Sequence, residues 1–234
     1  MTNKDLISQY VDTGMGIPRY QFDKLSSNDK GTYLRKIGIS IELAPKNIEH
    51  YYGVLPEEKQ LAIINKDAFW IRYMNNPTEK VQLAAVKKDG TSISYIIKNG
   101  INPSEEVQLA AVNENGKAIQ FIQNPSENVQ LSGVKENGTS ISWIIKNGIN
   151  PSEAVQLAAV KQDGTSISYI IKNGINPSEE VQLAAVNEIF LAIRYIQNPS
   201  DAVQFMAVKQ DVGAIRYIAN PSDRVKELQK QLYG

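Results

Sequence analysis

Few residues of this 234-residue chain have the types and the spacing that catalysis or metal binding requires. The chain has no cysteine and a single histidine, His50, which excludes thiolate chemistry and metal sites built from several histidines. His50 follows Glu49, but no nucleophile accompanies the pair, so we expect a surface or capping histidine. Gly14-Met15-Gly16 has only two of the three glycines of a phosphate-binding loop. We therefore expect a protein that is not an enzyme and that holds no metal and no cofactor.

The charge of the chain is balanced, with 25 acidic and 25 basic residues. Nothing in this total would attract a polyanion, so nucleic acid and anionic membranes are not expected as partners unless the binding is local. No apolar stretch approaches the about 18 residues of a membrane span, and residues 1–10 are too polar for the apolar centre of a signal peptide. The composition favours a soluble, cytoplasmic protein.

The chain is dominated by an internal repeat that begins with an Asn-Pro pair and recurs at intervals of 22 or 26 residues. Each pair is followed by Ser or Thr, then by an acid, and shortly afterwards by Val-Gln-Leu-Ala-Ala-Val or a close variant. Such a period is typical of solenoids, in which each unit contacts mainly its neighbours. The pairs begin at Asn76, Asn102, Asn124, Asn150, Asn176, Asn198 and Asn220.

Each repeat is predicted to form two short helices. We expect Asn to cap the first helix, Pro to occupy its first position and the acid to complete a capping box. An Asp-Gly or Asn-Gly turn such as Asp89-Gly90 follows, where glycine tolerates a positive φ. The second helix carries an isoleucine, a polar residue and an aromatic residue. A strand over this second half is the alternative, because β-branched and aromatic residues favour sheets.

The 26-residue repeats contain four additional residues, about one helical turn. We expect a longer second helix there, capped by Gly100, Gly148 or Gly174 with the following isoleucine folded back onto its end. The segment from Asp89 to Glu114 is identical to that from Asp163 to Glu188, which indicates a recent internal duplication.

The predicted fold class is all-α, an α-solenoid of roughly seven short helix pairs. Residues 1–55 belong to no repeat and are predicted to form an N-terminal helical cap, with helices over 5–11, 18–25 and 27–37. Residues 56–222 form the repeat array, and residues 223–234 form a C-terminal capping helix.

The block from Ala111 to Phe121 resembles an uncharacterised short helical-repeat family of viruses and protists, with the consensus A-V-x-x-N-G-x-A-L-x-Y. The resemblance covers roughly residues 56–221, and the chain departs from it at the four-residue insertions and at three unusual turns. The run from Ile17 to Ser27, with Thr32 to Lys36, is similar to the openings of small accessory proteins of tailed bacteriophages. These resemblances imply a helical array of phage origin, located in the bacterial cytoplasm, and bring no catalytic residues.

Repetition places equivalent residues in columns along a solenoid. One column of invariant glutamines either reads a partner or hydrogen-bonds the backbone of the next repeat, and its invariance favours the structural role. A second column precedes the aromatic residue, varies in sequence and is expected to be exposed. Its arginines either bind carboxylate or phosphate groups, or form salt bridges with acids such as Asp201 and Asp223. The second column consists of Arg72, Ser94, Gln120, Ser142, Ser168, Arg194 and Arg216.

Three repeats lose the glycine turn: Asp67-Ala68-Phe69-Trp70, Ile189-Phe190-Leu191 and Asp211-Val212-Gly213. We expect Phe69 and Trp70 to pack against the N-terminal cap, whereas no cover is evident for Ile189, Phe190 and Leu191. Arg194 follows Leu191 by one turn, which gives an apolar anchor beside a charged donor. On this basis, Phe190→Asp with Arg194→Ala is expected to abolish binding with little effect on melting temperature. The predicted partner-binding residues are Ile189, Phe190, Leu191, Arg194, Arg216 and Arg72.

The function predicted from these features is that of a phage accessory protein that binds and inhibits or sequesters a host protein, such as a defence protein. One alternative is a binder of a nucleotide or nucleic acid through pairs such as Arg194 and Tyr195, against which the balanced charge of the array argues. A structural component of the virion is the second alternative. A homo-oligomer is a further possible assembly, and no membrane is expected as a partner.

Overall fold

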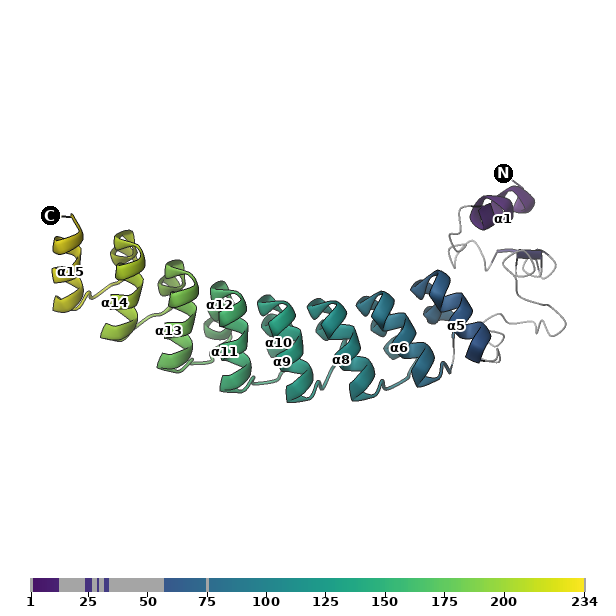
Figure 1. The fold of residues 1–234 in the computed structure, drawn as a ribbon, viewed down its shortest axis with the longest axis horizontal. Helices are drawn as coiled ribbons and strands as arrows, with labels where there is room; N and C mark the ends of the chain where they lie inside the picture. Colours follow the sequence, from purple (N-terminus) through teal and green to yellow (C-terminus); the bar gives the residue numbers. More distant parts are fainter. Residues whose placement is uncertain are drawn as a thin grey trace.

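The computed structural model describes residues 2–12, 24–26, 29, 32–33, 57–74 and 76–233 of the chain. Every regular element among these residues is helical, and seven helix pairs stand side by side in a gently curved row (Figure 1). The predicted all-α solenoid of about seven pairs is therefore confirmed. The first helices of the pairs are α5 (Glu57–Lys66), α6 (Glu79–Lys88), α8 (Glu105–Glu114), α9 (Glu127–Glu136), α11 (Glu153–Gln162), α13 (Glu179–Glu188) and α14 (Asp201–Gln210).

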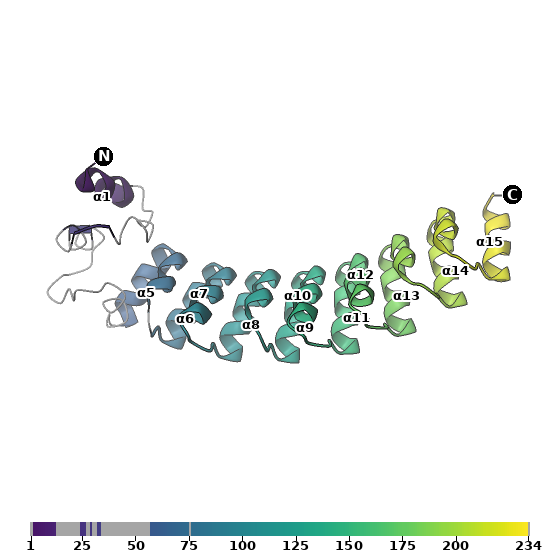
Figure 2. The same cartoon turned by 180° about the vertical axis from the view of Figure 1, so that it is seen from behind.

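The second helices form another layer, which faces the viewer in Figure 2. In the 22-residue repeats the second helix is a 3-10 helix, namely η1 (Ala68–Tyr73), η3 (Gly116–Phe121), η6 (Phe190–Tyr195) or η7 (Val212–Tyr217). In the 26-residue repeats a single 3-10 turn leads into an α-helix. These pairs are η2 (Gly90–Ser92) with α7 (Ile93–Lys98), η4 (Gly138–Ser140) with α10 (Ile141–Lys146), and η5 (Gly164–Ser166) with α12 (Ile167–Lys172).

The extra turn ends as predicted. Gly100, Gly148 and Gly174 are the described residues with positive φ, at 80°, 81° and 77°. At the first of them, the N–H of Gly100 donates to the carbonyl of Ile97, and the N–H of Ile101 donates to that of Ile96. This pair of bonds is a Schellman motif, in which the isoleucine folds back onto the helix end.

The first helices from α6 to α14 are capped by Ser or Thr and not by Asn, so the predicted capping box at Asn-Pro is wrong by two residues. Ser104 accepts a hydrogen bond from the N–H of Val107 at 3.4 Å, and Glu105 becomes the first helical residue. Pro103 lies buried in the preceding loop. Asn and Ser are comparable N-caps. The preference for Ser is therefore explained by a contact that its side chain makes with the neighbouring repeat.

That contact links neighbouring repeats. The hydroxyl of six N-caps donates a hydrogen bond to the acid in the first turn of the preceding first helix, so one side chain both caps its own helix and joins it to the preceding one. Between α8 and α9, for example, the Ser126 Oγ to Glu105 Oε1 distance is 2.5 Å. We call this series the cap ladder. Its described pairs are Thr78–Glu57, Ser104–Glu79, Ser126–Glu105, Ser152–Glu127, Ser200–Glu179 and Ser222–Asp201.

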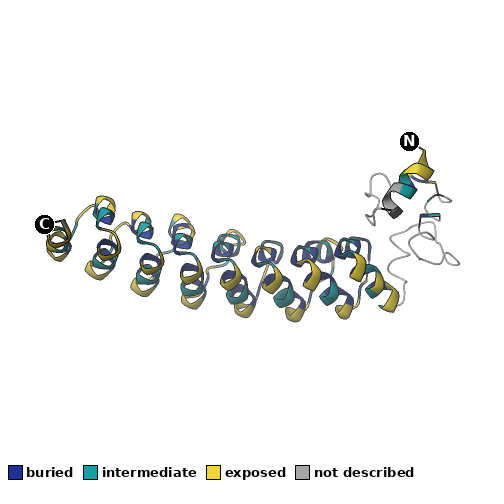
Figure 3. Ribbon diagram, turned by 45° about the horizontal axis from the view of Figure 1, so that its top comes forward, coloured by how far each residue is buried: buried dark blue, intermediate teal, exposed yellow. Residues whose placement is uncertain are grey.

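The core runs the length of the row between the two layers, where the buried faces are dark blue in Figure 3. In the repeat that starts at α8, Val107, Ala111 and Val112 have no exposed surface, and Ile119 from η3 is 1% exposed. The spacing of these residues brings valine and alanine onto helix faces that touch both the neighbouring repeat and the second layer. Each unit therefore buries its apolar residues only in the presence of neighbours.

The turn glycines are required for close approach and not for a positive φ, which corrects the prediction. A Cβ on Gly116 would lie 2.6 Å from the carbonyl oxygen of Gly133 in the next repeat, and one on Gly138 would lie 2.5 Å from that of Ala159. Where Ala68, Phe190 or Val212 replaces the glycine, the adjoining first helices pack less closely. The turn residue thus sets how tightly neighbouring repeats stack.

The two ends of the row are covered by other parts of the chain. Helix α1 (Asn3–Asp12) contributes Ile7 to the core, together with Leu25 and Tyr33. The ring of Tyr33 lies 6.3 Å from that of Trp70, as expected for an N-terminal cap. Phe69 was expected to pack against the N-terminal cap, but its ring contacts Tyr73 and Tyr95 of the array.

At the other end, helix α15 (Asp223–Tyr233) buries Val225 against α14. The helices predicted over residues 18–25 and 27–37 fall mostly outside the described residues.

Candidate binding surface

Charge is unevenly divided between the two layers of the array. We call the second helices and the loops that follow them, up to each Asn-Pro pair, the second layer. Its residues include seven cations and no acid, although the chain as a whole is neutral. The acids of the array lie in the first helices or at the turns. The second-layer cations are Arg72, Lys98, Lys117, Lys146, Lys172, Arg194 and Arg216.

Glu114 contacts this layer, where its carboxylate accepts a hydrogen bond from the N–H of Gly90. The turn residues Asp67, Asp89, Asp163 and Asp211 lie at the edge of the layer. Each of them accepts a hydrogen bond from the backbone N–H two residues later, and thereby caps its second helix. A carboxylate in this position offsets the positive helix end. The turn acids are therefore committed to local structure at the edge of the second layer.

Six of the seven cations lie over aromatic rings. The ammonium of Lys146 is 4.3 Å from the ring centre of Trp143, and the guanidinium of Arg216 is 4.9 Å from that of Tyr217. Each such contact is worth about 0.5–1 kcal/mol at an exposed site. Apart from Phe69, the rings belong to the aromatic position of the repeat. The other contacts are Arg72 with Phe69, Tyr73 and Tyr95, Lys98 with Tyr95, Lys172 with Tyr195, and Arg194 with Tyr195.

The ring of Tyr195 is flanked by cations from two repeats. Lys172 at the end of α12 lies 5.7 Å from the ring centre, and Arg194 of the same 3-10 helix lies 4.9 Å from it. Arg194 is exposed and Tyr195 is half-buried. The position therefore combines an aromatic face, two positive charges and access to solvent.

A groove of about 520 Å³ lies next to this position. It is lined by Ile171 and Ile196, the chain neighbours of Lys172 and Tyr195, and by the Asn-Pro loops of two repeats. Ile171 comes from a long second helix and Ile196 follows a short one. The remaining lining residues are Gly174, Ile175, Asn176, Pro177, Gln182, Gln197 and Asn198, so the wall is rich in amide groups.

The predicted salt bridges of the arginines are replaced by these ring contacts. Asp201 pairs with Arg224 at 3.1 Å, and Asp223 pairs with Lys226 at 3.1 Å. Within the described part of the chain, no ion pair includes a second-layer cation. Among the described residues, these cations therefore have no acidic side chain as an ion-pair partner and are available to an anionic ligand.

The column that was expected to be exposed is exposed only at its C-terminal end. Arg194 and Arg216 are exposed, but Arg72 is half-buried among three rings. Ser94 and Ser168 are each 7% exposed. The exposed cation of each long repeat is instead the lysine at the end of its second helix, Lys98, Lys146 or Lys172.

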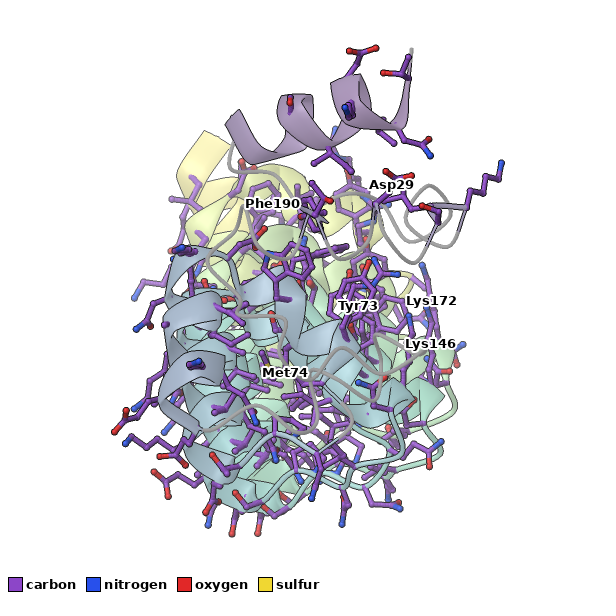
Figure 4. All side chains as sticks on the ribbon, turned by 90° about the vertical axis from the view of Figure 1, so that its right-hand side faces the viewer. Asp29, Tyr73, Met74, Lys146, Lys172 and Phe190 are labelled. Atoms are coloured by element: carbon purple, nitrogen blue, oxygen red, sulfur yellow. The ribbon has the colours of Figure 1, made fainter. Side chains whose placement is uncertain are left out.

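The three predicted turn residues are covered to a larger extent than expected. Ile189, Phe190 and Leu191 are all half-buried, and the first two pack against the core. The Ile189 methyl group lies over Gly164, where a Cβ would come within 2.6 Å of it. Figure 4, a view along the array, labels Phe190 at the turn edge and Lys146 and Lys172 together on the side of the second layer.

Leu191 and Arg194 do share a face, because residues three apart eclipse one another in a 3-10 helix. The predicted binding role of Ile189, Phe190, Leu191, Arg194, Arg216 and Arg72 stays a prediction. The fold brings Arg72, Arg194 and Arg216 onto the second layer, and Phe190 begins the same 3-10 helix that carries Arg194.

The glutamine column has the structural role that its invariance indicated, but with a different partner. Gln108 Nε2 donates to the carbonyl of Pro103 in its own repeat at 2.9 Å, and the equivalent bond recurs along the array. These bonds fix the Asn-Pro loop on the first helix, and among the described glutamines the predicted contact with the backbone of the next repeat occurs at Gln204. Gln204 additionally accepts from the N–H of Ser222.

The lysines of the long repeats were missed by the sequence interpretation. Lys98, Lys146 and Lys172 each follow the aromatic residue by three positions, one turn along the second helix. The sequence does contain a signal for them, because no acid occurs in any second-helix segment. A count of charges over the whole array does not reveal this pattern.

The carboxyl groups at the two ends of the cap ladder have lowered pKa values. The Thr78 hydroxyl and the Lys80 ammonium lower the pKa of Glu57. The Ser222 hydroxyl and the Arg224 guanidinium likewise lower the pKa of Asp201. Both carboxylates are held in their charged form by structural contacts.

The residues that the structure describes, in the ranges 2–12, 24–26, 29, 32–33, 57–74 and 76–233, show neither of the two patterns typical of metal sites and membrane spans. No group of three or more potential metal ligands occurs among them, and no helix in these ranges has the length and apolarity needed to cross a membrane. His50 and the segment Gly14-Met15-Gly16 lie outside the described residues.

Comparison with known proteins gives no assignment: no family model, no curated protein and no solved structure matches the chain.

Proposed function

We propose that this protein is a non-enzymatic binding protein that holds an extended anionic partner along its second layer. The observation that carries the proposal is the row of cations without acids on one layer of a neutral protein. Local charge of one sign attracts the opposite sign even where the net charge is zero. The sequence resemblance adds the proposal that the protein is a phage accessory factor and that its partner is a host molecule, bound or sequestered.

The partially exposed rings support a binding role for the same layer. Tyr169 and Tyr217 are each 37% exposed, among the most exposed large apolar residues that the structure describes. Tyr and Arg are enriched at the centres of binding interfaces, because they supply apolar area together with directed polar groups. A curved row of repeats presents such residues over a long surface, as solenoid binding proteins do.

The proposal is tested by removing charge from one layer at a time. Lys146→Gln with Lys172→Gln neutralises two second-layer cations. Lys135→Gln with Lys161→Gln removes the same charge from first helices of the same two repeats. All four lysines are exposed and lie in the last turn of a helix, so effects on the helix dipole are matched.

Two measurements compare these variants with the unaltered protein. We expect the net-neutral protein to be retained on a sulfonate resin at pH 7, and only the second-layer variant to lose retention. We expect affinity capture from a bacterial lysate to recover an anionic partner with the unaltered protein and the first-layer variant, but not with the second-layer variant. Equal retention and equal capture by both variants would reject the second layer as the binding surface.

A further inference from the structure

We infer that the anionic partner is a single-stranded nucleic acid, bound with its phosphates on the second-layer cations and its bases against the second-layer rings. This inference rests on the proposed function and names the ligand of the same surface. It differs from a nonspecific attraction to negative charge, because it assigns a separate task to the aromatic residues.

The rings distinguish a nucleic acid from an acidic protein. The face of an aromatic ring is electron-rich and therefore does not attract a carboxylate. A nucleobase, in contrast, stacks on such a face whatever its sequence, while arginine and lysine bind the neighbouring phosphates. Tyr195 with Lys172 and Arg194 provides both components at one position, with ring-to-cation distances of 5.7 Å and 4.9 Å.

The spacing of the rings favours a single strand over a duplex. Packed helices stand about 8–10 Å apart, so rings in successive repeats are separated by more than twice the about 3.4 Å rise of stacked bases. Only an unpaired strand can spread its bases to match this spacing. The repeats would therefore contact bases that are splayed apart, one stacking position per repeat.

The groove beside Tyr195 supplies polar groups for a base edge. Amide side chains pair with the donors and acceptors of bases, and Asn176, Gln197 and Asn198 line this groove with the apolar side chains of Ile171 and Ile196. Asn176, Gln197 and Asn198 are exposed. We assign to this junction the strongest single contact of the surface.

The decisive experiment uses the full chain and a fluorescein-labelled oligothymidylate of about 20 nucleotides, measured by fluorescence anisotropy between about 50 and about 200 mM salt. Polyglutamate, heparin and a duplex of the same length are the comparison ligands. The variants are Lys146→Gln with Lys172→Gln, the first-layer control Lys135→Gln with Lys161→Gln, Tyr169→Ala and Tyr169→Phe. Tyr169 is chosen because its ring is partly exposed.

Binding of the oligonucleotide should weaken with salt by about 0.7 log units of affinity per log unit of salt for each phosphate contact. The second-layer lysine variant should lower this slope by about 1.4, because it removes two contacts, while the first-layer control leaves it unchanged. Tyr169→Ala should weaken binding about tenfold through the loss of a stacking face, and Tyr169→Phe should bind normally. The duplex should bind less tightly than the single strand.

The other outcomes separate this inference from the proposed function. If polyglutamate and heparin bind as tightly as the oligonucleotide and Tyr169→Ala has no effect, the partner is another polyanion, so the nucleic-acid inference fails and the proposed function stands. If no polyanion binds at about 50 mM salt, both fail. Far-ultraviolet circular dichroism of each variant shows whether a loss of binding reflects unfolding, and the salt slope of the folded variants then decides.

Discussion

Ser126 and Glu105 belong to different repeats, and their side chains meet at an Oγ to Oε1 distance of 2.5 Å while Ser126 also caps its own helix. The hydroxyl accepts from the N–H of Val129 and donates to the carboxylate, so both of its hydrogen-bonding functions are used. One residue thereby determines where α9 begins and how α9 attaches to α8. This relationship recurs along the cap ladder.

The first prediction separates the two tasks of Ser126. Ser126→Ala should destabilise the protein by about 1 kcal/mol through loss of the N-cap. Ser126→Asp keeps a good N-cap but opposes Glu105 with a like charge, so it should destabilise too. Adding Glu105→Gln, whose amide can donate to the new carboxylate, should restore stability. Urea unfolding followed by circular dichroism measures these changes. If Ser126→Asp alone is as stable as the unaltered protein, the inter-repeat bond contributes nothing.

The second prediction concerns crowding at the turns. Gly116→Ala should cost about 1–3 kcal/mol, because the new methyl group would lie 2.6 Å from the Gly133 carbonyl oxygen. Gly213→Ala should cost less, since its nearest neighbour is the Asp211 side chain at 2.9 Å and can shift. Gly100→Ala meets no atom within 4 Å but has φ +80°, so about 1–2 kcal/mol of backbone strain is expected. Gly100→Asn should recover part of that cost, whereas Gly116→Asn should not.

The third prediction is a pH dependence at the C-terminal end of the cap ladder. The folded state lowers the pKa of Asp201, first through the Ser222 hydroxyl and then through Arg224. The stabilisation is therefore complete above the unfolded pKa of about 3.9 and is lost as the pH falls through the lowered folded value. Carboxyl titration by NMR should show the Asp201 pKa rising toward its usual range in Ser222→Ala. An unchanged pKa in this variant would show that the hydroxyl is not the cause.

The fourth prediction revises the expectation for the Phe190 turn. Because Phe190 is half-buried and packs against the core, Phe190→Asp should lower stability by about 1–3 kcal/mol. Leu191→Asp is the matched control, and it should change stability by less than about 0.5 kcal/mol, since Leu191 is not among the residues packed on the core. Thermal melts of the two variants decide between them. Equal melting temperatures of the two variants would show that Phe190 does not stabilise the core, as the sequence-based prediction of an exposed binding residue requires.

The duplicated segment shows what the sequence decides and what it leaves open. The residues from Asp89 to Glu114 and from Asp163 to Glu188 are identical, and both copies fold into the same helices with the same Schellman ends. Periodicity, the turn residues and the glycine cap were therefore sufficient to predict the all-α array, its number of pairs and its longer second helices. The longer second helices and their glycine caps depend on hydrogen bonds within a repeat, which the local sequence specifies.

The two copies differ where neighbouring repeats contribute. Asn99 belongs to a repeat that is preceded by a short one, and its side-chain amide donates to the carbonyl oxygens of Arg72 and Met74 in that short repeat. Asn173 belongs to a repeat that is preceded by a long one, and its side-chain amide donates to the carbonyl oxygen of Tyr169 in its own repeat. Tyr95 is half-buried beside Phe69 at 5.6 Å, but its counterpart Tyr169 is exposed.

The choice of Ser over Asn as N-cap and the need for glycine at the turns were likewise decided by tertiary structure. Each of them depends on which groups from adjacent repeats lie within contact distance. That distance is set by the stacking of helices, and the sequence of a single repeat does not specify it.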